Sequence, residues 1–83
     1  MAQQFSLYPN PASQKVTIKA ELTKPQAATI KLINMLGQVV STVSLPINNK
    51  VNYQLPLNKL AKGIYVVQLE TETGMQAQRL VIQ

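Results

Sequence analysis

The chain has 83 residues, of which 46% are hydrophobic, and a formal net charge of +5. This length suits one domain, whose folded state buries only about 60% of the surface that the unfolded chain exposes. Because the sequence contains no cysteine and no histidine, it excludes disulfides, thiolate or imidazole metal sites and His-based catalytic triads.

The first four residues, Met1-Ala2-Gln3-Gln4, are typical of an expression start or a linker remnant, and we expect the domain to span residues 5–83. No charged start is followed by the apolar run of a signal peptide, and no apolar stretch has the length of a membrane-spanning helix. We therefore expect no direct membrane insertion, and we expect any export signal to lie on a longer parent chain.

Seven short strands are predicted from the alternation of apolar and polar residues. Their ranges are 5–8, 16–21, 28–33, 38–45, 51–55, 63–71 and 75–82. Residues that favour turns separate them, at 9–11, 22–26, 34–37, 48–50 and 72–74. Pro46 and Pro56 are predicted to end strands, and residues 57–62 to cross over to the next strand. Since no helical period is present, the chain predicts an all-β fold, a seven-stranded immunoglobulin-like antiparallel β-sandwich.

Residues 60–65 form the corner around which the predicted strands are arranged. Leu60 is an apolar anchor, and Gly63 permits a positive φ that a side chain disfavours. Tyr65 is placed as in the tyrosine corner of immunoglobulin-like sandwiches, where the ring packs inward and the hydroxyl bonds to upstream backbone. The alternative is a plain buried strand in which Tyr65 is an ordinary core residue.

The polar residues predict no catalytic site, so we expect a domain that is not an enzyme and holds no cofactor or metal. The three carboxylates do not form an acid–base pair, and the three glycines lie singly in separate turns rather than in a phosphate-binding loop. Carbohydrate binding requires exposed aromatic platforms. We expect all four aromatic residues to face the core: Phe5, Tyr8, Tyr53 and Tyr65.

The basic residues are spread along the chain rather than clustered. Seven lysines and Arg79 give the positive charge, and three glutamates oppose it. This distribution is typical of solvated strand faces and not of a nucleic-acid stripe, so no nucleic-acid partner is expected.

Four short motifs follow one another along the chain: Tyr8-Pro9-Asn10-Pro11, the segment 35–40 around Gly37, Leu60-x-x-Gly63-x-Tyr65, and the segment 78–83. Their order and spacing closely resemble those of the type A C-terminal sorting domain, or Por secretion tail, of the type IX secretion system of Bacteroidota. The resemblance covers about Leu7 to Gln83. It marks as candidate recognition residues Tyr8, Pro9, Asn10, Pro11, Gly37, Leu60, Gly63, Tyr65, Arg79, Leu80, Val81, Ile82 and Gln83.

The resemblance implies a targeting device. Such domains lie at the C-terminal side of exported cargo, are recognised in the periplasm, and direct the cargo through an outer-membrane translocon with its shuttle proteins. A surface sortase then usually cuts ahead of the folded domain and joins the cargo to an anionic lipopolysaccharide. The resemblance implies that the cut lies upstream of about Gln4 or is missing from this fragment. The expected location is the periplasm in transit, then the cell surface or the extracellular space.

The chain departs from the family pattern at two places. Asn34 stands where the family often has Asp, which matters little because both residues suit the turn. The terminal strand has Arg79 as its single basic residue and ends in Gln83, which weakens any role for terminal positive charge. Two alternatives remain, an immunoglobulin-like spacer or adhesion module without a sorting role, and a carbohydrate-binding module.

The terminal strand is the candidate recognition element. We expect it to pair with its predecessor and to leave its other edge open for strand addition by a partner. Leu80 and Ile82 point to one side and Arg79 and Val81 to the other, so one pair anchors the core and the other is free. On this basis removal of residues 81–83 deletes few core contacts and leaves the domain folded, with a stability loss of roughly 1–3 kcal/mol.

Overall fold

The structure is a computed structural model that describes residues 5–83, and every regular element in this range is a β-strand. All pairings between strands are antiparallel. The strands are β1 (Ser6–Tyr8), β2 (Lys15–Ile33), β3 (Val39–Pro56), β4 (Gly63–Thr71) and β5 (Gly74–Ile82). They form one sheet in the order β1-β2-β4-β5, and β3 pairs with the opposite edge of β2.

The prediction of seven strands is wrong, because five strands fill residues 5–83. The expected turns at 22–26 and 48–50, and the strand end expected at Pro46, are continuous strand within β2 and β3. The register between β2 and β3 shifts on either side of Gln26, so Pro25 lies in an irregular stretch where the ladder requires no N–H from it. A proline at such a position bends a strand without ending it.

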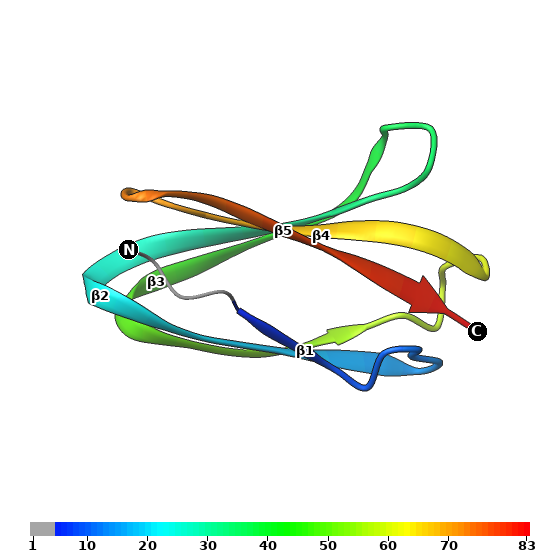
Figure 1. The fold of residues 1–83 in the computed structure, drawn as a ribbon, viewed down its shortest axis with the longest axis horizontal. Helices are drawn as coiled ribbons and strands as arrows, with labels where there is room; N and C mark the ends of the chain where they lie inside the picture. The colour runs from blue at the N-terminus through cyan, green and yellow to red at the C-terminus, as the bar shows by residue number, and fades with distance from the viewer. Residues whose placement is uncertain (1–4) are drawn as a thin grey trace.

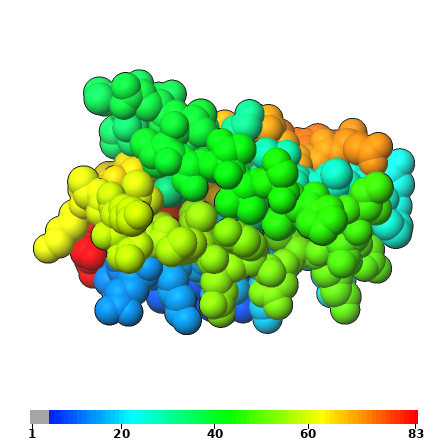
Figure 2. Space-filling model, turned by 180° about the vertical axis from the view of Figure 1, so that it is seen from behind, coloured from blue at the N-terminus to red at the C-terminus, as the bar shows by residue number. Residues whose placement is uncertain are grey.

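The expected immunoglobulin-like sandwich is not confirmed, because the structure has a single curled sheet. Figure 1 shows β2 and β3 bending together, so that the two halves of each long strand lie on opposite sides of the core. Seen from behind in Figure 2, β3 runs across the surface of the molecule. The antiparallel all-β class is confirmed.

The core lies inside this curl, and the alternation predicted from the sequence supplies it. Alternate residues are buried in parts of the strands, as in Ile30 and Leu32 of β2 and Val67 and Leu69 of β4. Each fully buried aliphatic side chain contributes about 1.5–3 kcal/mol. The buried hydrophobic residues are Phe5, Ala12, Val16, Ile18, Ala28, Ile30, Leu32, Val51, Leu55, Leu57, Tyr65, Val67, Leu69, Leu80 and Ile82.

Candidate functional site

The four motifs of the sequence, distant along the chain, meet at one end of the molecule. The register of β4 and β5 places Gly63 opposite Ile82 and Tyr65 opposite Leu80. A surface hollow of about 200 Å³ lies between the turn at 34–36 and the corner at 62–65, and both segments line it. The loop at 9–12 contacts the C-terminal part of β5. The structure therefore brings nearly all candidate recognition residues to one region.

The side chain of Asn10 binds the backbone of β5 as a neighbouring peptide group does. Its Nδ2 donates to the carbonyl of Arg79 at 3.0 Å, and its Oδ1 accepts from the N–H of Val81 at 3.1 Å. These two groups belong to the edge of β5 that faces away from β4. The two prolines that flank Asn10 fix the loop, and both X–Pro peptide bonds are cis. The YPNP motif thus covers the edge of the terminal strand.

The backbone of Ala12 extends this contact by a parallel β-bridge to Ile82. The Ala12 N–H donates to the carbonyl of Val81 at 2.8 Å, and the N–H of Gln83 donates to the Ala12 carbonyl at 2.7 Å. Ala12 itself is buried. Together, Asn10 and Ala12 satisfy consecutive backbone groups from Arg79 to Gln83, and we call this contact the terminal clasp.

Nearer the start of β5, glutamine side chains bond to the backbone of Phe5. Phe5 N–H donates to Oε1 of Gln76 at 3.1 Å, and Nε2 of Gln78 donates to the carbonyl of Phe5. The first described residues and the last strand are therefore joined along both halves of β5.

The expectation that the outer edge of the terminal strand is open is wrong for residues 79–83. The terminal clasp occupies their backbone groups, and a partner strand would have to displace it. The division of faces is confirmed, since Leu80 and Ile82 are buried and Arg79 is exposed. Because Ile82 belongs to the core, the expectation that residues 81–83 make few core contacts is also wrong.

The tyrosine corner is confirmed. Tyr65 is buried, and its hydroxyl donates to the carbonyl of Ala61 at 2.7 Å, four residues upstream. Gly63 has a φ of 152°, in the region that L-residues rarely adopt, and a Cβ built there meets no atom within 4 Å. Glycine is therefore required by the backbone and not by a lack of space. Leu60 is half-buried and packs against the core.

The turn at Gly37 is held by Asn34. Its Oδ1 accepts from the N–H of Leu36 and from the N–H of Gln38, each at 3.0 Å. An aspartate oxygen accepts the same two bonds, which explains why Asn suits this position. Gly37 has a φ of 83°, which glycine adopts without the strain of a side chain.

One aromatic residue departs from the expected burial. Tyr8 is 44% exposed, although we expected it to face the core. The Nζ of Lys19 lies 5.9 Å from the centre of its ring, at the outer limit of a cation–π contact. The remaining aromatics follow expectation, since Phe5 and Tyr65 are buried and Tyr53 packs against the core.

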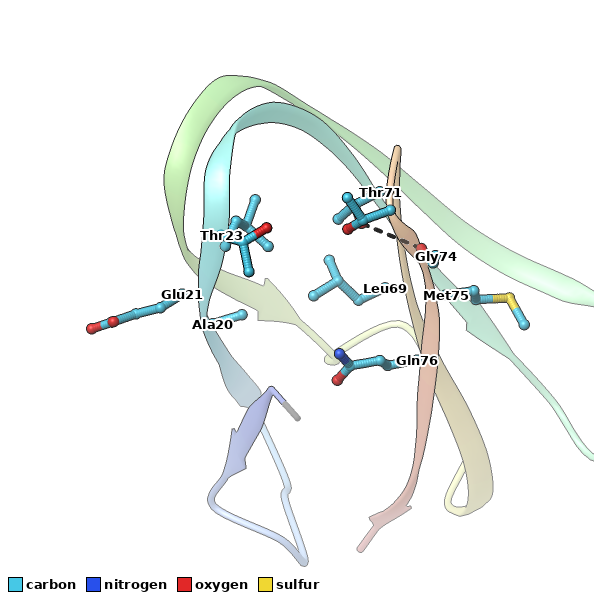
Figure 3. A pocket seen from close by; sticks show the side chains of 10 residues that line it. Ala20, Glu21, Thr23, Leu69, Thr71, Gly74, Met75 and Gln76 are labelled. Atoms are coloured by element: carbon cyan, nitrogen blue, oxygen red, sulfur yellow. Dashed lines mark hydrogen bonds between the residues drawn. The ribbon is translucent and has the colours of Figure 1, made fainter. Parts of the chain in front are cut away.

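A second hollow, of about 120 Å³, lies between the bend of β2 and the hairpin that joins β4 to β5. Figure 3 shows its lining, in which Leu69 and Ala20 are apolar and Glu21 points away from the space.

Within residues 5–83, no group of three or more metal-ligating side chains occurs, and no helix has the length and apolarity to cross a membrane.

These features define a small all-β module whose first loop and last strand are joined edge to edge. The chain belongs to the secretion system C-terminal sorting domain family, which matches residues 6–83 and comprises sorting domains of the type IX secretion system. No curated protein matches the chain.

Sequence reasoning missed the terminal clasp. Asn10 and Val81 are 71 positions apart. The one local signal is an asparagine held between two prolines, which indicates a fixed side chain without naming its partner.

Proposed function

We propose that this domain directs a cargo protein, attached at its N-terminal side, from the periplasm through the outer-membrane translocon to the cell surface. The observation that carries the proposal is the family match over residues 6–83, which includes all four motifs. The translocon and its shuttle proteins are the proposed partners.

We further propose that a surface sortase cuts ahead of Phe5 and joins the cargo to an anionic lipopolysaccharide. A peptidase acts on accessible, extended chain and not on backbone that is held in hydrogen bonds. The amide and carbonyl of Phe5 are both bonded to glutamine side chains of β5, and β1 follows directly. We therefore propose that the cut falls upstream of about Gln4.

Some candidate recognition residues are buried, and others are accessible at the surface. Leu80, Ile82 and Tyr65 are buried, so they position the site rather than contact a receptor. The side chains available to a receptor are those that the structure leaves exposed or half-exposed beside the clasp: Tyr8, Pro9, Pro11, Arg79, Val81 and Gln83. We propose that the secretion machinery recognises this exposed group on the folded domain.

The test is a fusion of residues 5–83 behind a periplasmic reporter in a bacterium that has this secretion system. Cell fractionation and surface labelling should find the reporter outside the outer membrane, and a fusion to an unrelated β-domain of similar size should stay in the periplasm. Retention of both fusions would contradict the sorting role and favour a spacer module.

A further inference from the structure

The sheet has a free edge on the side of β3. Within residues 5–83, β3 pairs with β2 alone, so its outer edge carries backbone groups without a partner strand in this part of the chain. The opposite side of the sheet ends at β5, whose terminal residues are covered by the clasp. Of these two sides, β3 offers the free edge.

The direction of each backbone group on β3 follows from the register. Val81 of β5 points its N–H and C=O away from β4, toward the clasp. Its neighbour Leu80 therefore points these backbone groups toward β4, where they pair with those of Tyr65. Backbone N–H and C=O groups point to alternate sides along a strand, and in a hydrogen-bonded pair both residues point them toward each other. By this rule Gln68 of β4 and Lys31 of β2 form such a pair, and so do Ile30 of β2 and Val43 of β3. Thr42 and Ser44 therefore point their N–H and C=O groups outward.

Between its two ends, the segment 41–45 of this edge lacks the usual protection against strand addition. Natural edges are blunted by lysines, prolines or bulges. Here Pro46 and the register shift beside Val39 bracket the segment 41–45, and no charged residue occurs between Lys31 and Lys50. Although the chain carries a net charge of +5, its longest stretch without a charged residue includes this segment of the free edge.

We propose that β3 is an isologous interface, at which a second copy of this chain adds its own β3 antiparallel about a two-fold axis at Val43. In this register Thr42 lies opposite Ser44 of the second copy, and the two pairs form four backbone hydrogen bonds. Thr–Ser pairs across antiparallel strands are favourable, and no like charges meet.

The side chains at the two ends of the segment complete the match. Val39 and Val40 are exposed at one end, and Ile47 is 70% exposed at the other. In an antiparallel two-fold pairing, the Val39–Val40 end of each copy lies beside Ile47 of the other copy. The exposed apolar side chains therefore come together at both ends of the interface. A second copy is therefore the occupant whose charge-free segment and apolar ends fit this edge, and the inference is independent of the sorting role.

Sedimentation equilibrium of the purified chain tests the proposal. Since the interface is small, we expect a reversible dimer that forms between about 10 µM and about 1 mM. Ser44→Pro removes an outward N–H without removing a bond to β2, and it should weaken association by about tenfold or more. Asn52→Lys, at an exposed position of the same strand outside the proposed interface, is the control for the charged variants at position 42 and should leave the dimer intact.

A charge exchange tests the register itself. Position 42 of one copy lies diagonal to position 42 of the other, within reach of long side chains. Thr42→Lys and Thr42→Glu should each reduce self-association, and an equal mixture of the two should restore it. Circular dichroism confirms that each variant is folded. A chain that stays monomeric to about 1 mM, a dimer that survives both Ser44→Pro and Thr42→Lys, or a mixture that does not associate contradicts the proposal.

Discussion

The side-chain amide of Asn10 and the backbone of Val81 are bonded across 71 positions of sequence, with Oδ1 accepting from the Val81 N–H at 3.1 Å. The same amide donates to the carbonyl of Arg79, so one side chain bonds to two residues of the terminal strand. This contact gives the YPNP motif a physical role, because it fixes the edge and the position of the strand that carries the exposed Arg79.

Asn10→Ala should lower the free energy of unfolding by about 1 kcal/mol, because both bonds are lost and both are near the surface. Asn10→Asp keeps the acceptor for Val81 but places a carboxylate against the carbonyl of Arg79, so it should not restore stability. Hydrogen exchange measured by NMR should show faster exchange at Val81 in the Ala variant. Unchanged exchange would mean that the clasp does not protect the strand.

Tyr65→Phe should cost about 1–2 kcal/mol, because it removes the 2.7 Å bond to Ala61 and keeps the packing of the ring. Denaturant melts of the wild-type and variant domains measure the difference. Tyr53→Phe, at a half-buried tyrosine elsewhere, is the matched control and should cost less. Equal stability of Tyr65→Phe and the wild type would show that Tyr65 contributes only through the packing of its ring.

Gly63→Ala should destabilise the domain by about 1 kcal/mol or more, since its φ of 152° is unfavourable for an L-residue although the space is open. Gly63→Val should cost more than Gly63→Ala, because a β-branched side chain restricts the backbone further. The two variants are compared by the same melts. A neutral Gly63→Ala would show that the corner relaxes to an ordinary extended conformation.

Deletion of residues 81–83 should cost more than the roughly 1–3 kcal/mol expected from the sequence. It removes the buried Ile82, a loss that by itself is worth about 2–5 kcal/mol, together with the clasp bonds of Val81 and Gln83. For a domain of this size the truncated chain should be largely unfolded by circular dichroism. Arg79→Ala, on the exposed face of the same strand, should leave the melt unchanged.

The sequence predicted the β class, the core alternation and the corner at Tyr65, since each depends on neighbouring residues. It did not predict the strand number, because we expected Pro25 and Pro46 to end strands. A proline ends a strand only where the ladder requires its N–H, and the register shifts near Gln26 remove that requirement. It also did not predict the exposure of Tyr8, which lies on the outer side of a strand of three residues.

The positive charge should not give specific nucleic-acid binding. The seven lysines are exposed or half-exposed, and Lys31 pairs with Glu70 at 3.2 Å. Binding to duplex DNA, measured by fluorescence anisotropy, should be weak at low salt and absent at about 150 mM salt. Sub-micromolar binding at that salt concentration would show that the lysines form a functional surface.

Surface delivery of a reporter fused ahead of Phe5 tests whether the secretion machinery recognises the exposed residues beside the terminal clasp. Arg79→Glu alters a side chain that points to solvent, and Asn52→Glu makes a matched change on the exposed side of β3. Both fusions should be folded and equally abundant. We predict that the wild-type and Asn52→Glu fusions reach the surface and that Arg79→Glu remains largely in the periplasm. Equal delivery of all three would contradict recognition at this end of the domain, and periplasmic retention of the wild type would contradict the sorting role.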